Sequence, residues 1–375
     1  MKKIFFALSF AAMVASCCSD AGMKVEVKNS SSNARTLETV ELAWGDVTAK
    51  LADVTPDNVI VMLDGQQVPS QVMFTDGDSA KPATLIFQAT VGAGAAVSYD
   101  VAVGVKEEYE QQAFSRYIPE RKDDYAWENN VIAQRVYGQA LSDEVHTPGV
   151  DVWSKSVSDL VVDKWYGIGH YHKDAGEGMD CYKVASTLGG GASAPMVGVD
   201  DMLLSGNWYG WTRTANGPIR TEFTLTYEPF MVGDKEVSIA KTYSLDANTH
   251  FSKVVDVYTG NFSDIDVAIG SIIHTADAPQ LTDGTVIAVY EPASDDQYKS
   301  GCSIGVGVIV PGAADGALEI RDHKVKTRNI KAGEPSVYYV GTGWSGGGMP
   351  TAQSWFDCIS TAAAAVAEPL TVTIK

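Results

Sequence analysis

Residues 221–228, TEFTLTYE, decide the fold class of this chain. Phe223, Leu225 and Tyr227 alternate with polar residues, so one face of the segment is apolar and the other polar, as in a half-buried β-strand. The same reading applies to five later segments: 236–245, 253–258, 267–274, 285–290 and 303–310. No regular alternation with helices accompanies them, which argues against a parallel α/β sheet. We therefore expect an all-β protein built on a large two-sheet antiparallel sandwich.

Shorter strands separated by turns occupy the chain before residue 110. They end at turn signals such as Asp64-Gly65, and residues 106–124, which are rich in charge, have the composition of a linker. We predict a small N-terminal β-sandwich over residues 24–108 and a larger sandwich that would carry the site over residues 109–375.

One helix is expected near the C-terminus. Thr351 is a suitable N-cap residue, and Pro369 follows the end of the pattern. Between them, Trp355, Ile359 and Val366 fall on one helical face, so this helix should pack on the sandwich.

The first 17 residues have the features of a lipoprotein signal peptide. Lys2 and Lys3 precede an apolar stretch too short to span a bilayer, and residues 14–17, VASC, match a bacterial lipobox. Cys17 would then carry the lipid that anchors the exported protein to a membrane; the alternative is an ordinary secretory signal. No acidic run follows Cys17, which favours the periplasmic side of the outer membrane over the cell surface.

Composition excludes one class of partner and limits others. The net charge is −19 and the 28 Lys and Arg residues form no basic cluster, so nucleic acid is not an expected partner. Cys181, Cys302 and Cys358 allow at most one internal disulfide in the mature chain. Neither C-x-x-C nor H-E-x-x-H occurs, so we expect no cofactor, with a divalent metal beside His170 and His172 as the open alternative.

The densest group of titratable residues lies in residues 165–191, WYGIGHYHKDAGEGMDCYKVASTLGGG. Residues 170–182 hold two histidines, three acidic residues and two tyrosines among two glycines. Loops with such composition carry catalytic groups more often than other segments do, so this stretch is the candidate active site. The alternative is a solvated loop without function.

A second dense stretch, residues 123–138, reads DDYAWENNVIAQRVYG. Trp127 could stack on a sugar ring and Arg135 could bind a carboxylate in a bidentate manner. The alternative places Trp127 in the core and pairs Glu128 with Arg135 as a structural ion pair.

Further candidates are scattered along the chain. VDVWSK adds Trp153 and Lys155, Gly217-Pro218-Ile219-Arg220 places Arg220 at the start of a strand, and Ile272-Ile273-His274 places His274 at the end of one.

Several of these motifs together resemble a known family. YAWENNVIAQRVYG, VDVWSK, KWYGIGHYHKDAGEGMDCYKV, GPIRTEFTLTY and YYVGTGWSGGGMPTAQSW are similar, in this order, to a Bacteroidota family of exported, often lipidated proteins encoded in polysaccharide-utilisation loci and classed as a domain of unknown function. The resemblance implies a galactose-mutarotase-like β-supersandwich. It also implies, from one branch, an oligosaccharide dehydratase acting on unsaturated, uronate-containing products of ulvan breakdown. The chain departs from the family pattern at Asn130, Gln134 and Cys181, which bears on the substrate.

The reaction itself dictates which groups to seek. Elimination from a uronate removes a weakly acidic C–H proton beside a carboxylate, which needs a cation, a base and a proton donor. We assign Arg135 or Arg220 to the carboxylate, His172 as base with His170 as second choice, and Tyr182 or Glu177 as donor. The substrate-binding candidates are Trp127, Glu128, Trp153, Lys155, Tyr166, Asp180, His274 and Trp344.

Three functions are compatible with these residues. A carbon–oxygen lyase, either a dehydratase or a chain-cleaving polysaccharide lyase, acting on an acidic oligosaccharide is the preferred one because base, acid and cation types all occur. A sugar mutarotase or epimerase and a non-catalytic glycan-binding lipoprotein are the alternatives. The sequence does not indicate an oligomeric state.

Overall fold

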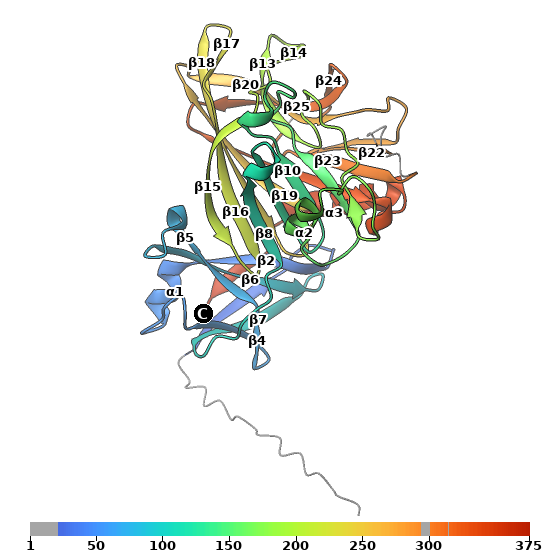
Figure 1. Ribbon diagram of the computed structural model, residues 1–375. Helices are drawn as coiled ribbons and strands as arrows, with labels where there is room; N and C mark the ends of the chain where they lie inside the picture. The colour runs from blue at the N-terminus through green and yellow to red at the C-terminus, as the bar shows by residue number, and fades with distance from the viewer. Residues whose placement is uncertain (1–21, 294–300, 314) are drawn as a thin grey trace, which may run out of the picture.

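The protein consists of two lobes made mostly of β-strands (Figure 1). The computed structural model describes residues 22–293, 301–313 and 315–375; the predicted lipidation site, Cys17, lies outside these residues. Within the described residues the α-helices are α1 (Trp44–Lys50), α2 (Val162–Ile168) and α3 (Ala352–Ala367). The strands pair in antiparallel fashion, which confirms the all-β prediction.

The described residues bear on membrane insertion and on the cysteines. None of their helices is long and apolar enough to cross a membrane. Cys181 and Cys358 form no disulfide among the described residues.

The smaller lobe contains two sheets around its own apolar core. The first sheet has the order β27 (Thr371–Ile374), β1 (Met23–Lys28), β7 (Ala96–Val103), β3 (Val59–Leu63) and β4 (Gln66–Val68). The second has the order β2 (Arg35–Ala43), β6 (Pro82–Val91) and β5 (Ser70–Phe74). Val25 and Phe87, from different sheets, are both fully buried in the core between them.

The last strand of the chain returns to this smaller lobe. Val25 of β1 lies opposite Ile374 of β27, so the C-terminal strand extends the N-terminal sheet. The predicted range 109–375 for the larger sandwich therefore does not describe residues 371–374. The boundary near residue 108 stays a prediction.

The larger lobe is organised around a nine-stranded sheet. Its strands are β15 (Trp208–Asn216), β16 (Arg220–Tyr227), β18 (Lys235–Asp246), β19 (Phe251–Gly260), β26 (Pro335–Trp344), β23 (Ser303–Ile309), β22 (Val286–Pro292) and β21 (Gln280–Asp283) in that order, with β17 (Phe230–Val232) beside β18. Phe223, Leu225 and Tyr227 are buried on one face of β16, as their alternation predicts. They belong to the core that fills the sandwich.

Two five-stranded sheets complete the larger lobe. One has the order β14 (Asp201–Met202), β13 (Ala192–Val197), β20 (Asp264–Ile272), β25 (His323–Lys331) and β24 (Leu318–Ile320). The other, which positions the candidate site, has the order β12 (Gly178–Met179), β11 (Asp151–Lys155), β10 (Ala133–Val136), β9 (Asp124–Asn129) and β8 (Ala113–Ile118). Strand β8 lies in the segment expected to be a linker, so that interpretation of residues 106–124 was wrong for 113–118.

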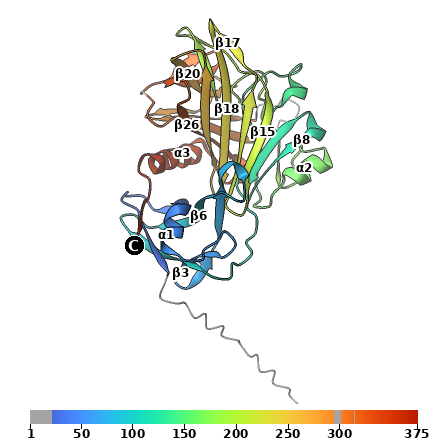
Figure 2. The ribbon, with the colours of Figure 1, turned by 90° about the vertical axis from the view of Figure 1, so that its left-hand side faces the viewer.

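Helix α3 packs closely on the nine-stranded sheet because glycines leave space for it. Thr351 caps the helix in a capping box with Ser354, as expected for its N-terminus. A Cβ atom added to Gly305 would come within 2.5 Å of the Trp355 ring, and one added to Gly343 within 2.9 Å of the same ring. Trp355 is fully buried in this contact. Figure 2 shows α3 and α2 on opposite sides of the molecule.

Candidate functional site

Arg135 is the centre of a buried ionic cluster in the β8–β12 sheet. It lies on the central strand β10 and is 2% exposed. Its Nε is 2.7 Å from Asp151 Oδ2, its Nη2 is 2.6 Å from Asp180 Oδ2 and its Nη1 is 3.2 Å from Asp124 Oδ2. All three guanidinium nitrogens therefore donate to carboxylates of the protein. Arg135 does not suit the role of binding a substrate carboxylate, because its donors are already used.

The charges of this cluster influence one another strongly. Burial by itself would lower the pKa of Arg135, but the surrounding groups, with Asp180 and Asp151 foremost, together raise that pKa well above its ordinary value. Burial raises the pKa of Asp124, although Arg135 opposes the shift. The cluster thus depends on Arg135 to keep carboxylates ionised inside the protein.

Two tyrosine hydroxyl groups connect the cluster to its surroundings. The Tyr171 oxygen accepts a hydrogen bond from Arg135 Nη1 at 3.1 Å and another from Arg121 Nε at 3.1 Å. Tyr166 donates to Asp124 Oδ2 at 2.9 Å. Arg121 is only partly buried, so it links the buried cluster to the surface beside α2.

His172 lies where this cluster reaches solvent. Its Nδ1 is 3.4 Å from Asp180 Oδ2 and 3.2 Å from the Asp180 carbonyl oxygen, and its side chain is 30% exposed. Asp180 also binds Arg135, so a fixed carboxylate orients the imidazole. An Nδ1–H directed at Asp180 leaves Nε2 as the basic nitrogen, the tautomer that a general base requires.

Glu128 and Lys155 form a separate buried ion pair. Their charged atoms are 3.1 Å apart and both side chains are fully buried. Glu128 also accepts hydrogen bonds at 2.7 Å from the backbone N–H groups of Val161 and Val162, where α2 begins. These residues hold α2 on the sheet and are closed to a substrate. Glu128 therefore pairs with Lys155, not with Arg135 as the structural alternative supposed.

The two tryptophans proposed as sugar platforms are core residues. Trp127 is fully buried against Phe223, and its Nε1 donates to Ser252 Oγ at 2.9 Å. Trp153 is 1% exposed and stacks between Trp165 and Tyr171, with ring centroids 5.3 Å from each. Neither ring offers a free face, because the second dense stretch folds into the centre of a covered sheet.

Tyr182 and Trp344 are also enclosed by protein, and the exposed residue His274 has both ring nitrogens bonded to protein. The Tyr182 hydroxyl is buried without a hydrogen-bond partner among the described residues, and burial raises its pKa well above the ordinary value. Trp344 is 5% exposed. The two ring nitrogens of His274 lie 2.7 Å from Glu291 Oε1 and 2.7 Å from the Lys183 carbonyl oxygen. These contacts are structural, and they leave no ring nitrogen of His274 for a substrate.

Glu177 and His170 lie on the surface near the cluster. Glu177 forms an ion pair with Lys164, whose hydrogen bond lowers the pKa of the Glu177 carboxyl. A carboxylate that stays ionised is a poor proton donor, so Glu177 does not suit the role assigned to it. His170 is exposed.

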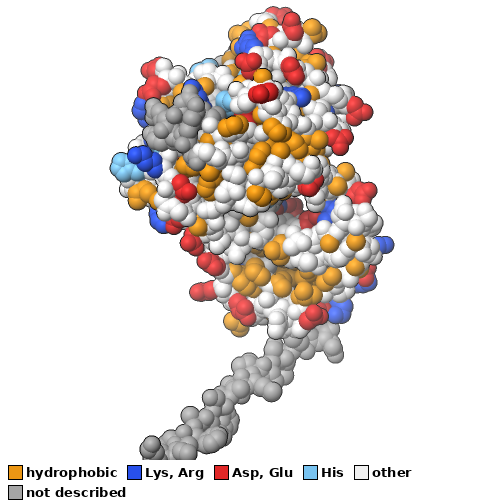
Figure 3. Space-filling view, turned by 90° about the vertical axis from the view of Figure 1, so that its right-hand side faces the viewer, with side chains coloured by type: hydrophobic (Ala, Val, Ile, Leu, Met, Phe, Trp, Pro, Cys, Tyr) orange, Lys and Arg blue, Asp and Glu red, His pale blue; other side chains and the backbone are white. Residues whose placement is uncertain are grey.

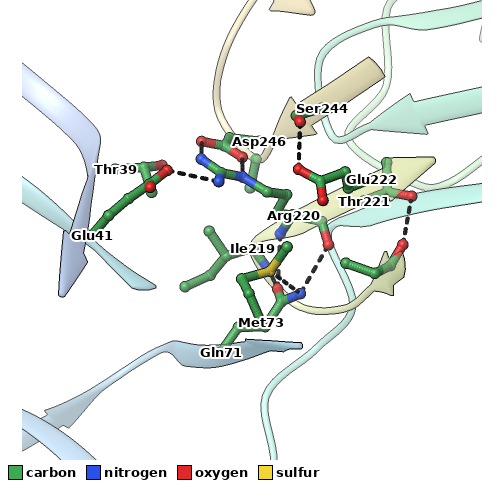
Figure 4. Close-up of polar contacts among 12 residues, drawn as sticks. Thr39, Glu41, Gln71, Met73, Ile219, Arg220, Thr221, Glu222, Ser244 and Asp246 are labelled. Carbon is green, nitrogen blue, oxygen red and sulfur yellow. Dashed lines mark hydrogen bonds and ion pairs between the residues drawn. The ribbon is translucent and has the colours of Figure 1, made fainter. Parts of the chain in front are cut away.

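Arg220 lies at the junction of the two lobes, where it contacts Glu41 of the smaller lobe (Figure 4). Its Nε and Nη2 contact the two carboxylate oxygens of Asp246 at 2.5 and 2.9 Å, and its Nη1 is 2.7 Å from Glu41 Oε1 on β2. Gln71 of β5 also binds the backbone of residues 219 and 220. Arg220 thus joins the lobes and is already neutralised by two acids.

Sequence reasoning missed four members of the cluster: Arg121, Asp124, Asp151 and Tyr171. Asp151 could have been found, because it precedes Val152-Trp153 on a strand expected next to the one carrying Arg135. Arg121 was missed because it lies in residues 106–124, which were expected to form a linker. Among the described residues, no group of three or more His, Cys, Asp or Glu side chains is arranged to hold a metal ion.

Comparisons with known proteins agree with the exported all-β character of the chain. A model of the family described as "Domain of unknown function (DUF4861)" matches residues 27–372, and a model of the prokaryotic membrane lipoprotein lipid attachment site matches residues 1–17. "Uncharacterized protein P7" of Formosa agariphila is 28% identical over 374 residues, covering 94% of this chain and 93% of that protein.

Two solved structures from Enterococcus faecalis share the fold. One is a protein in glycosyl hydrolase family 38, with a TM-score of 0.56, 11% identity and coverage of 96% of this chain and 48% of that one. The other is an α-mannosidase, with a TM-score of 0.55, 10% identity and coverage of 95% and 46%. The chain therefore spans about half the length of the solved structures that it matches, and the likeness concerns the fold alone.

Proposed function

We propose that this chain, which belongs to the DUF4861 family, is a lipid-anchored carbon–oxygen lyase that eliminates water from an acidic oligosaccharide, with His172 as its base. The observation that carries the proposal is the arrangement of His172, Asp180 and Arg135. A partly exposed imidazole is oriented by a carboxylate that a buried guanidinium holds in place. The carbohydrate-active neighbours in fold support a sugar substrate.

Arg121 takes the role of the cation in this proposal. Its Nε is engaged by Tyr171, while its Nη atoms form no hydrogen bond within the described residues. A guanidinium with a free edge can pair with the carboxylate of a uronate. It can then stabilise the negative charge that develops when the C–H proton beside that carboxylate, or conjugated with it through a double bond in an unsaturated uronate, is removed. Arg121 replaces Arg135 and Arg220, whose donors are used by the protein.

His172 can serve both halves of the elimination. It takes the proton from carbon, the electron pair of that C–H bond forms the C=C bond, and the C–O bond to the leaving hydroxyl breaks. The imidazolium then gives the proton to the departing oxygen, which leaves as water. One residue acting on one face of the sugar needs no second acid, consistent with the buried hydroxyl of Tyr182 and the ionised Glu177.

The test is to incubate the protein with oligosaccharides that end in a saturated uronate, which carries a C–H proton beside its carboxylate, and with unsaturated uronate oligosaccharides. Both are incubated with and without chelator, and the products are weighed. The proposal predicts products lighter by one water. Shorter chains would instead indicate a chain-cleaving lyase or hydrolase, an unchanged mass with an altered anomer ratio a mutarotase, and binding without change a glycan-binding protein.

Variants assign the activity to the site. We expect His172→Ala to lower kcat/KM by about 10²-fold or more, because it removes the base. The matched control is His170→Ala, an exposed histidine two residues away, which should retain turnover. Arg121→Gln should raise KM for acidic substrates and also lower kcat, because Arg121 both binds the carboxylate and stabilises the developing charge. Turnover that survives His172→Ala would refute the assignment.

A further inference from the structure

A groove of about 540 Å³ lies at the junction of the two lobes and is not used by the proposed reaction. It is bounded by β2 of the smaller lobe, by the outer face of β18, β19 and β26, and by α3. The hollow between the lobes is visible in Figure 3. Its volume falls within the about 300–1,000 Å³ typical of small-molecule sites. Because α3 and α2 are on opposite sides of the molecule (Figure 2), the groove is separate from the His172 site.

The floor of the groove is a row of side chains that crosses the nine-stranded sheet. Strand register places Ser244 opposite Lys253, Lys253 opposite Tyr339, and Tyr339 opposite Ile309, and all four line the groove. Tyr339 is partly exposed, unlike Trp127 and the other enclosed aromatic residues. An aromatic ring beside a polar side chain on a flat sheet suits the apolar face and the hydroxyl groups of a sugar ring.

The opposite side of the groove is an irregular part of β2. The pairing of β2 with β6 shifts between Arg35 and Glu38, and Leu37 in this bulge has a positive φ of 51° with its side chain 41% exposed. Bulges and left-handed non-glycine residues are enriched where a strand presents groups to a ligand. Arg35 is 5% exposed, and its Nε has no hydrogen-bond partner among the described residues.

The charges around the groove cancel. Its cationic and acidic residues are Arg35, Arg220 and Lys253 against Glu38, Glu41 and Asp246. Arg220 is paired with two of these acids, and Arg35 lies 3.4 Å from Glu38. Burial lowers the pKa of His250, which also lines the groove, so this residue is neutral near pH 7. A groove whose positive and negative charges cancel does not attract a strongly charged ligand. Its carboxylates and amines can still form hydrogen bonds with the hydroxyl groups of an uncharged ligand.

We propose that this groove is a second carbohydrate site, which binds an uncharged pyranose unit stacked on Tyr339 with its hydroxyl groups bonded to Lys253 and Glu38. The site is made of residues other than those of the proposed reaction, so binding at this groove can be tested independently of the dehydratase activity. An anchored protein with such a site would hold a neutral part of a glycan while His172 acts on an acidic part.

The experiment measures binding of neutral disaccharides composed of glucose, galactose, mannose, xylose or rhamnose to the full-length protein, by saturation-transfer NMR and calorimetry. An unsaturated uronate disaccharide is the acidic comparison. We expect saturable binding of at least one neutral sugar, weakened about tenfold or more by Tyr339→Ala and also weakened by Lys253→Gln. His172→Ala should leave this binding unchanged, which separates it from failure of the proposed function.

Two controls keep the result interpretable. Tyr209→Ala removes a tyrosine that is 50% exposed on β15 outside the groove lining, and it should bind as the original protein does. Tyr339 also packs against the core below α3, so its variant is checked by thermal unfolding, while Lys253 is exposed and its substitution should not affect folding. The proposal would be overturned by any of three results: no saturable binding, unchanged affinity in both groove variants, or a preference of this site for the acidic sugar.

Discussion

Replacing Arg135 by methionine should strongly destabilise the larger lobe. The variant keeps most of the side-chain volume but leaves the carboxylates of Asp124, Asp151 and Asp180 buried without their shared cation. Removing one partner of a buried ion pair costs about 3–5 kcal/mol, because the remaining charge stays desolvated. With three carboxylates affected, we expect a loss of unfolding free energy at the upper end of that range, limited by protonation of the carboxylates.

The loss should depend on pH in a defined direction. Burial already raises the pKa of Asp124 above 3.8 in the folded state, and removing Arg135 raises it further. A group whose folded pKa is raised binds more protons in the native state, so its contribution to stability is lost as pH rises from the unfolded pKa through the folded pKa. The difference between Arg135→Met and the original protein should therefore be larger at about pH 7 than at about pH 5.

Urea unfolding followed by tryptophan fluorescence measures this difference. Arg116→Met is the matched control: Arg116 also binds two carboxylates, Glu120 and Asp163, but its side chain is 27% exposed. Exposed pairs contribute about 0–1 kcal/mol, so this variant should remain close to the original protein. If Arg135→Met loses no more free energy than Arg116→Met, or if its deficit shrinks as pH rises, the reasoning about the cluster is refuted.

Two further predictions concern other buried groups. Lys241 and Asp256 are both fully buried, with 2.7 Å between their charged atoms. Lys241→Met should therefore lower the free energy of unfolding in urea by about 3–5 kcal/mol, whereas the double variant with Asp256→Leu should recover much of this loss. A double variant less stable than the single one would contradict this prediction. Burial raises the pKa of the Cys181 thiol to about 12. Iodoacetamide at about pH 8 should therefore leave Cys181 unmodified in the native protein and alkylate it after unfolding, as measured by peptide mass spectrometry. Rapid labelling of the native protein would contradict this prediction.

Much of the fold could be predicted because its signals are local. The alternation around Phe223 identifies a half-buried strand whatever its neighbours are, and Thr351 followed by an apolar helical face marks α3. The candidate site was only partly predictable. His172 and Asp180 come from one short stretch and do lie together, but the roles of Arg135 and Trp127 depended on what covers them.

The sequence by itself thus determined the strand-rich architecture, the terminal helix and the lipobox ending at Cys17, since each is encoded within a few neighbouring residues. Only the tertiary structure decided which charges meet. Arg135 is joined to acids from β9, β11 and the residue after β12, and Arg220 to Glu41, 179 residues away in the chain. Strand order and register control such encounters, and side-chain periodicity fixes the face of a strand without fixing its partner. For that reason an arginine that could have bound a sugar acid instead holds the sheet together beneath His172.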